Sequence, residues 1–227
     1  MIKNSIQQMF NNIAQSYDKL NAVISFGLHL KIKRKAIKNV PLKLDFKILD
    51  ACTGTGDIAI YLAKNVAQNG TVIGVDFSEQ MLKIAEKKAK KIDNISFINA
   101  DVLNLPFEDA QFDACFISFG LRNLADLEKG LSELKRVTKK GGLVVNLDTG
   151  KPKGFFGFLY KIYFFKIVPI LGQLFHGDAS PYKYLPASTK NFPDGDKLVK
   201  IFQSLGFKNV KKFDFLFGTM SQQIGEV

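Results

Sequence analysis

Apolar residues follow two patterns along the chain, short runs and helical spacing. The two patterns alternate from residue 46 onward. Short apolar runs predict strands at 46–50, 71–76, 96–100, 112–118, 143–148 and 210–216. Apolar positions three and four residues apart predict helices at 57–65, 78–91, 124–138 and 197–205. Because strands and helices alternate, we expect an α/β fold with a doubly wound parallel sheet.

Two segments outside this alternation have patterns of their own. Residues 1–40 predict an N-terminal helical cap, with helices at 2–17 and 29–39 separated at Gly27. Residues 151–190 are rich in Phe and Tyr, and we expect them to form a lid inserted into one domain of residues 1–227. Lysines and Pro169 interrupt this segment too often for a membrane span. The late helix and strand at 197–216 fit an antiparallel hairpin that closes the sheet.

Composition narrows the function classes. The chain has 227 residues, a net charge of +11 and two cysteines, which favours a globular protein in a reducing cytoplasm. No secretory signal is expected in residues 1–10, and no metal-ligand cluster surrounds His29 or His176. The positive charge permits nucleic acid or an anionic membrane as a partner. The lysines recur at helical spacing without interleaved aromatics, so we expect exposed helix faces and no nucleic acid.

Acidic residues end three successive predicted strands. Asp50 precedes a glycine turn with Gly54 and Gly56, Asp76 ends the second strand, and Asp101 follows the third. Carboxylates at one edge of a parallel sheet suit the hydroxyls of a ribose and the positive charge of a sulfonium. The third glycine of a dinucleotide-binding turn is missing. The pattern therefore predicts S-adenosylmethionine as the cofactor, without naming the acceptor.

Three motifs carry a resemblance over nearly the whole chain. The chain is similar to class I S-adenosylmethionine-dependent methyltransferases, which implies a mostly parallel seven-stranded sheet. More narrowly, it resembles the family that C-methylates the ring of ubiquinone and menaquinone precursors. The motifs are residues 9–14 with Tyr17, Asp18, Asn21 and 25–29; residues 105–107 and 112–113 with the specific run 117–123; and Tyr182, Tyr184, Leu185, Phe192 and Pro193.

The resemblance implies a set of cofactor contacts. Thr55 occupies the family's glycine turn, Asp76 its second acid, Asp101 and Val102 its adenine position, and Ser118 the start of its second signature. The expected cofactor-binding residues are Asp50, Gly54, Thr55, Gly56, Asp76, Asp101, Val102 and Ser118. Asp50 and Asp57 are also candidates for the amino group of the cofactor, although an acid at position 57 equally suits a helix N-terminus.

The implied reaction transfers a methyl group to a ring carbon of a prenylated quinol, most simply demethylmenaquinol to menaquinol. Arg122 and Asn123 are the first catalytic candidates, because a phenolate needs stabilisation and an arginine is a poor base. The alternative for Arg122 is a structural ion pair with Asp126. His29 is the best titratable candidate, with packing or capping as its alternative. Tyr17, Asp18 and Tyr184 either shape the ring site or pack the lid.

Membrane contact and nucleic acid remain the open questions about partners. The aromatic segment beside Lys151, Lys153, Lys161 and Lys166 predicts peripheral contact with an anionic membrane, at the inner face for a cytoplasmic enzyme. The alternative is a methyltransferase acting on RNA or on another small molecule. Amino-directed nucleic-acid enzymes carry Asn/Asp-Pro-Pro-aromatic where this chain has residues 118–121. The motifs do not distinguish menaquinone from ubiquinone precursors and do not give the oligomeric state.

Overall fold

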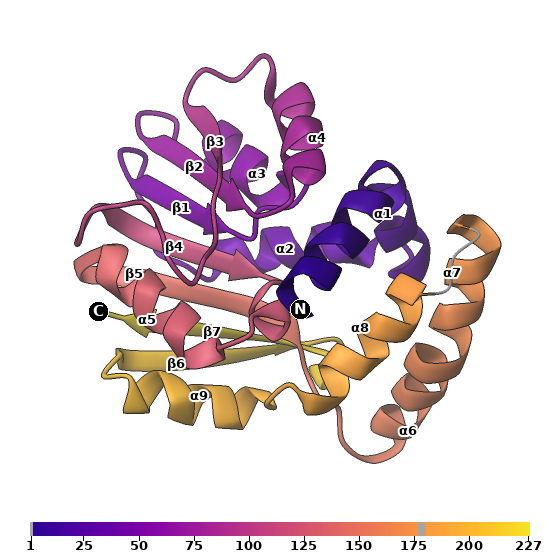
Figure 1. Cartoon of the computed structure of the whole chain (residues 1–227). Helices are drawn as coiled ribbons and strands as arrows, with labels where there is room; N and C mark the ends of the chain where they lie inside the picture. The colour runs from indigo at the N-terminus through magenta and orange to yellow at the C-terminus, as the bar shows by residue number, and fades with distance from the viewer. Residues whose placement is uncertain (1, 177–179) are drawn as a thin grey trace.

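The computed structural model describes residues 2–176 and 180–227, and for residues 2–4, 172, 174–176 and 180–183 it describes the backbone alone. His176 and Tyr182 therefore have no described side chains. The described residues form one seven-stranded sheet in the order β3-β2-β1-β4-β5-β7-β6 (Figure 1). Its strands are β1 (Lys47–Ala51), β2 (Thr71–Asp76), β3 (Ile95–Asn99), β4 (Phe112–Ser118), β5 (Thr138–Thr149), β6 (Lys208–Phe215) and β7 (Met220–Glu226).

Pairing within the sheet confirms the doubly wound, mostly parallel architecture. Strands β3, β2, β1, β4 and β5 run parallel to one another, and β7 is antiparallel to both β5 and β6. The helices are α1 (Ile2–Ile24), α2 (Leu28–Lys38), α3 (Asp57–Asn65), α4 (Glu79–Ala89), α5 (Leu127–Val137), α6 (Gly154–Ile162), α7 (Val168–His176), α8 (Ser180–Asn191) and α9 (Gly195–Ser204). Short helical turns are η1 (Leu121–Asn123), η2 (Tyr163–Ile167) and η3 (Leu216–Gly218).

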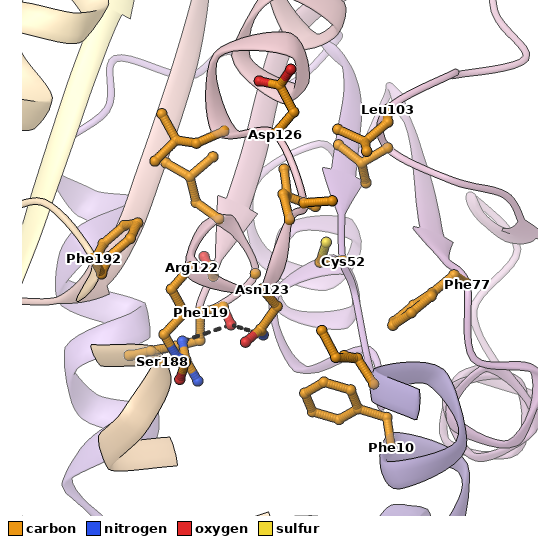
Figure 2. A pocket seen from close by; sticks show the side chains of 18 of the residues that line it. Phe10, Cys52, Phe77, Leu103, Phe119, Arg122, Asn123, Asp126, Ser188 and Phe192 are labelled. Atoms are coloured by element: carbon orange, nitrogen blue, oxygen red, sulfur yellow. Dashed lines mark hydrogen bonds between the residues drawn. The ribbon is translucent and has the colours of Figure 1, made fainter. Parts of the chain in front are cut away.

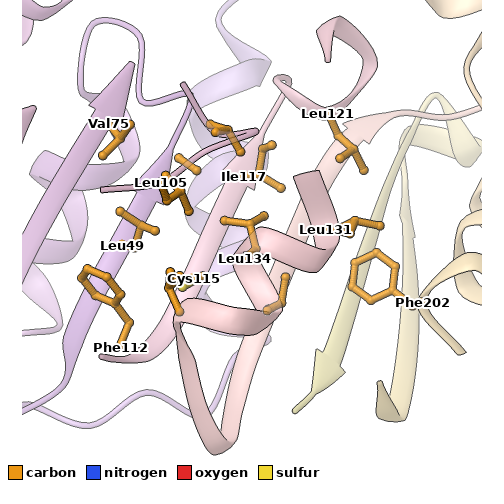
Figure 3. Packing of buried hydrophobic residues seen from close by; sticks show 14 of the residues in the cluster. Leu49, Val75, Leu105, Phe112, Cys115, Ile117, Leu121, Leu131, Leu134 and Phe202 are labelled. Carbon is orange, nitrogen blue, oxygen red and sulfur yellow. The ribbon is translucent and has the colours of Figure 1, made fainter. Parts of the chain in front are cut away.

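Two apolar layers cover the sheet. Helices α5 and α9 pack on one face over Leu49, Phe112 and Cys115, and Figure 3 shows Leu131, Leu134 and Phe202 closing that layer. Helices α2 and α3 pack on the other face. Burying each such side chain contributes about 1.5–3 kcal/mol, which holds both layers against the strands. The sheet is thus a rigid base on which the strand ends can hold a site.

The predicted boundaries agree fully with the structure for three elements and differ from it for others. Strands 71–76 and 112–118 and helix 57–65 are confirmed at both ends. Helix α1 is seven residues longer than the predicted 2–17, because it packs against α4 and the lid. Helix α5 begins at Leu127 and not at 124, since the Asp126 carboxylate caps it by accepting from the backbone N–H of Lys129.

Strand β7 is the element that the polarity pattern did not predict. The strand predicted to be last, 210–216, corresponds to β6, and β7 follows it. Its Gln222 and Gln223 are fully buried, a place where glutamine rarely occurs. Gln222 donates to the Ala36 carbonyl at 2.8 Å, and Asn146 donates to Gln223 at 2.6 Å, which offsets the cost of burial. Likewise, β5 starts at Thr138, five residues before the prediction.

The predicted lid segment consists of α6, η2, α7 and α8, which lie with α1 beyond the arrowheads of the parallel strands (Figure 1). The turn η2 has π-helical geometry just before Pro169, which lacks an N–H and cannot continue a regular ladder. The expectation that this segment is too interrupted to span a membrane was wrong. Residues 154–171 form a helical stretch long and apolar enough to do so, and 17% of it is buried.

Candidate active site

Two strained loops meet at the carboxyl ends of β1 and β4. Cys52 and Phe119 both adopt positive φ, 55° and 56°, which side chains other than glycine rarely do. Gly120 lies against the first loop so closely that a Cβ there would be 2.4 Å from the Cβ of Cys52. Such strain persists where the surrounding fold enforces it, commonly at functional sites. The two loops form the floor of a cavity, and Figure 2 shows Cys52 and Phe119 within it.

This first cavity has a volume of about 840 Å³, within the range of small-molecule sites. Eight of the expected site residues line it: Tyr17, Gly54, Asp76, Asp101, Val102, Ser118, Arg122 and Asn123. No role in the site was predicted for Phe10, Phe77 and Met81, which also line it, although Phe10 lies in the first motif. Phe10 comes from α1, so only the docking of that helix brings it here (Figure 2). Phe77 directly follows an acid at a strand end, and that position could have indicated it.

Asp76 is a buried acid in the lining of this cavity. Its carboxylate accepts from the backbone N–H groups of Gly54 at 2.8 Å and Ser78 at 2.9 Å. Burial raises the pKa of Asp76 to about 6, although these hydrogen bonds favour the ionised form. Asp101 also lines the cavity, and its carboxylate accepts from the N–H of Leu103 at 3.0 Å. These two acids give the cavity hydrogen-bond acceptors at neighbouring strand ends.

Three of the expected cofactor residues shape the glycine turn. Asp50 is buried and accepts from the Thr53 hydroxyl at 2.6 Å and from the Ala59 N–H at 3.1 Å. The Thr55 hydroxyl donates to Asp18 of α1 at 2.6 Å. Gly56 has φ 83°, and a Cβ there would lie 3.0 Å from that of Ala85, so the turn needs glycine at this position.

Asp57 belongs to an ion-pair network that joins four helices. Its carboxylate lies 3.0 Å from Lys33 of α2 and 2.7 Å from Lys88 of α4, and Lys88 lies 3.0 Å from Asp18 of α1. Burial alone would raise the pKa of Asp57, but the two lysines lower it to about 2. The suggestion that Asp57 meets the amino group of the cofactor stays a prediction, but this carboxylate is already paired with two lysines and does not line the first cavity.

Arg122 is paired with Asp148, and the alternative pairing with Asp126 was wrong. The guanidinium Nη1 lies 2.7 Å from the Asp148 carboxylate and donates at 2.7 Å to the carbonyl of Phe119. Burial alone would lower the pKa of Arg122, but Asp148 outweighs it and the pKa is raised. The side chain is thus a fixed cation at the carboxyl end of β4, and Asp148 is a residue the motifs did not identify.

Asn123 is held beside Arg122. Its Nδ2 donates to the same Phe119 carbonyl at 3.1 Å, as the dashed lines in Figure 2 show. The hydroxyl of Tyr184 donates to Asn123 Oδ1 at 3.1 Å. Tyr184 belongs to α8, so the lid segment contacts the strand-end residues directly. The strained Phe119 therefore serves as the shared acceptor that orients both candidate catalytic side chains.

His29 lies in a second cavity of about 420 Å³. Tyr17, Phe119 and Arg122 line both cavities, so the two adjoin at these side chains. The Nδ1 of His29 lies 2.7 Å from the Ser25 hydroxyl. Burial and then Lys33 lower the pKa of His29, so the imidazole is neutral at pH 7. A neutral imidazole can accept a proton.

Comparison with known proteins gives consistent results. The ubiE/COQ5 methyltransferase family matches residues 1–226. The chain is 43% identical to a demethylmenaquinone methyltransferase of Staphylococcus saprophyticus over 98% of this chain and 96% of that protein. It is 42% identical to one of Staphylococcus carnosus over 98% and 93%. Both relatives are matched along almost their full lengths.

Solved structures share the fold at lower identity. A methyltransferase from Aquifex aeolicus, described as dependent on S-adenosylmethionine, has a TM-score of 0.69 and 21% identity, covering 95% of this chain and 97% of that one. Phosphoethanolamine N-methyltransferase 2 of Haemonchus contortus, in complex with S-adenosylmethionine, has a TM-score of 0.62 and 20% identity, covering 82% and 38%. The strand-end acids and the fixed arginine agree with the family match and with these relatives. The chain belongs to the ubiE/COQ5 methyltransferase family.

Proposed function

We propose that this protein uses S-adenosylmethionine to methylate a ring carbon of a prenylated quinol, converting demethylmenaquinol to menaquinol. The observation that carries the proposal is the position of Arg122, a fixed cation in the lining of both cavities. The larger cavity has acids for a nucleoside, and the smaller has a mostly apolar lining for a prenylated ring. The curated relatives at about 40% identity are demethylmenaquinone methyltransferases, which supports this choice of acceptor.

The donor set of the first cavity fits the proposed cofactor. Asp76 is a buried carboxylate placed to accept from ribose hydroxyls, with Gly54 leaving room for close approach. Phe77 and Met81 offer apolar surface to an adenine, and Asp101 offers an acceptor for its amino group. When bound, the cofactor supplies a methyl group already activated on a sulfonium. The protein's part is alignment of the ring and control of its charge.

Ring methylation needs electron density at the attacking carbon. Loss of a proton from the neighbouring hydroxyl provides it, and the guanidinium of Arg122 stabilises the resulting phenolate. The Nε of Arg122 is buried without a hydrogen-bond partner in the described structure, so it remains able to donate to such an oxygen. We assign the proton acceptor to His29, with Tyr17 positioning the ring between the two. After the new carbon–carbon bond forms, the ring carbon releases its own proton to water, His29 returns the hydroxyl proton to the oxygen, and aromaticity returns.

The direct test is methyl transfer from labelled S-adenosylmethionine to three acceptors: demethylmenaquinol, demethylubiquinol and bulk RNA. We expect label in menaquinol. Label in RNA without label in either quinol would overturn the proposal. The nucleic-acid alternative has little chemical support here, because burial and the surrounding acids raise the pKa of Cys52 well above its usual value. A protonated thiol is a poor nucleophile for attack on cytosine.

Peripheral membrane contact is part of the proposal. Helix α6 exposes Phe155 and Phe158 to solvent, and exposed lysines flank them at 151, 153, 161 and 166. Large exposed apolar side chains beside cations suit the surface of an anionic bilayer. The opposite side of the segment packs on α1 through Phe164 and Val168. One side of this helical segment is packed and the other is exposed to solvent. We therefore expect it to lie on the inner face of the membrane and not to cross it.

A further inference from the structure

The second cavity extends well beyond the space a ring needs. Its lining includes Tyr17, His29 and Arg122, the polar groups assigned to the ring above, and Tyr17 and Arg122 also line the first cavity. From there the lining becomes apolar and is built from α1, α6 and α8, with Ile24, Leu159 and Leu185 among its members. The cavity therefore has a polar end beside the first cavity and an apolar end directed at the lid helices.

Three phenylalanines from distant parts of the chain form the outer rim of this cavity. Phe26 lies between α1 and α2, Phe156 on α6 and Phe217 in η3, and all three line it. Phe156 and Phe217 stack with their centroids 4.1 Å apart and their planes 2° apart. Phe26 packs near Tyr163, with ring centroids 6.1 Å apart. Their exposed fractions are nevertheless 77% for Phe26, 49% for Phe156 and 73% for Phe217.

Two of these rim residues are held in strained backbone. Phe26 has φ 50° and Phe217 has φ 57°, a region that costs a non-glycine residue on the order of 1 kcal/mol or more. Each is followed directly by a glycine, Gly27 or Gly218, whose φ is also positive, at 71° and 87°. Exposing a phenyl ring to water and straining its backbone are both unfavourable. The exposed rings and the strained backbone do not contribute to packing of the core. Their joint placement at the mouth of one cavity therefore indicates contact with an apolar ligand.

We infer that the second cavity is the binding site for the first isoprene units of the substrate's prenyl tail, and that Phe26, Phe156 and Phe217 form a collar around the tail where it leaves the protein. This inference rests on the proposed function and deepens it. A cavity of about 420 Å³ holds a drug-sized ligand, which corresponds to a bicyclic ring and the start of its tail. A longer tail must pass the collar, whose Phe156 lies on α6 together with the exposed Phe155 and Phe158.

The test compares two acceptors in detergent solution, so that membrane binding plays no part. One acceptor is demethylmenaquinol with a prenyl tail, and the other is the same ring without a tail. The variants are Phe26→Gly and Phe217→Gly, which remove the ring and also relieve the positive φ. The matched control is Phe158→Ala, because Phe158 is 61% exposed on the same helix as Phe156 but is not part of the cavity lining. Thermal unfolding is measured for each variant.

We expect each glycine variant to raise KM for the tailed acceptor by roughly tenfold, as loss of part of a phenyl contact predicts. The tail-less acceptor should show unchanged kinetics, the thermal midpoint should stay or rise, and Phe158→Ala should behave like the unmodified protein. Equal effects on both acceptors, or an equal effect of Phe158→Ala, would overturn the collar. If the unmodified protein methylates neither quinol acceptor, the proposed function itself fails, and the inference falls with it.

A second measurement does not depend on any variant. An isoprenoid alcohol without a ring should inhibit the unmodified protein competitively against the tailed acceptor and leave the affinity for S-adenosylmethionine unchanged. Inhibition competitive with S-adenosylmethionine, or none at all, would contradict the assignment of this cavity to the tail.

Discussion

The guanidinium of Arg122 and the carboxylate of Asp148 form a buried pair that joins η1 to the end of β5. Nη1 donates to Oδ1 at 2.7 Å, and the backbone N–H of Arg122 donates to Oδ2 at 3.2 Å. The two side chains are 8% and 0% exposed. One carboxylate therefore fixes both the backbone and the side chain of the residue that we place against the substrate. We propose that Asp148 is a positioning residue for Arg122.

Replacing Asp148 with asparagine should leave Arg122 buried without a counter-charge. Removing one partner of a buried pair costs about 3–5 kcal/mol, so the free energy of unfolding in denaturant should fall by that order. Misplacement of Arg122 should lower kcat on the order of 10²-fold. The affinity for S-adenosylmethionine, measured by calorimetry, should change little, because Asp148 is not among the residues that line the first cavity.

Two controls separate positioning from structural support. Asp148→Glu keeps the charge and should recover part of kcat. The double variant Arg122→Met/Asp148→Leu removes both charges and should regain most of the lost stability without regaining turnover. If the double variant turned over as well as the unmodified protein, Arg122 would have no place in the chemistry.

Cofactor affinity should depend on pH through Asp76, whose pKa is about 6. Ribose hydroxyls donate to the ionised carboxylate, so affinity should be full above that pH and fall as pH drops through it. The decline should approach about tenfold per pH unit. Because burial raises this pKa, the folded protein holds the proton more tightly than the unfolded chain. The contribution of Asp76 to stability therefore falls as pH rises from about 4 to about 6.

Calorimetric titrations with S-adenosylmethionine between pH 5 and pH 8 measure this dependence. Asp76→Asn should bind weakly with a flat profile over the same range. A sloping profile that survived the substitution would assign the titration to another group.

The close approach of the β1 and β4 loops makes Gly120 sensitive to any side chain. Gly120→Ala would place a Cβ 2.4 Å from Cys52 Cβ and 2.7 Å from its Sγ. Overpacking of this kind typically costs about 1–3 kcal/mol, and both loops line the first cavity, so stability and cofactor affinity should fall together. Thermal unfolding and calorimetry measure the two effects.

A compensating substitution tests the cause. Cys52→Gly removes the contacting atoms and suits the φ of 55° at that position. The double variant Gly120→Ala/Cys52→Gly should therefore recover most of the stability that Gly120→Ala loses. A loss that persisted unchanged in the double variant would show that the clash with Cys52 is not its origin.

Membrane contact predicts co-flotation with vesicles containing anionic lipid at low salt. Each lysine near such a surface contributes about 1 kcal/mol, so Lys161→Gln and Lys166→Gln should each weaken binding about fivefold. Phe155→Ser/Phe158→Ser should also reduce flotation, while turnover in detergent stays unchanged. Absence of flotation by the unmodified protein at low salt would count against the membrane surface.

The fold was predictable because its signals are local. Apolar runs in β2 and β4 and the alternation with α3 through α5 depend on residues close in sequence, and burial on a parallel sheet requires such runs. Strand β7 was missed because its buried glutamines are stabilised by Ala36 and Asn146, far away in the chain. No pattern of polarity within residues 220–226 carries that information.

By itself, the sequence determined the α/β architecture, the row of acids at the strand ends and the family, all of which follow from periodicity and short motifs. Only the tertiary structure decided which acids face a cavity. It turned Asp50 and Asp57 to structural partners, and it set Asp148 beside Arg122. It also brought Phe26, Phe156 and Phe217 to one rim. Buried ion pairs and a shared cavity depend on how distant segments pack together. No single segment of the sequence predicts that packing.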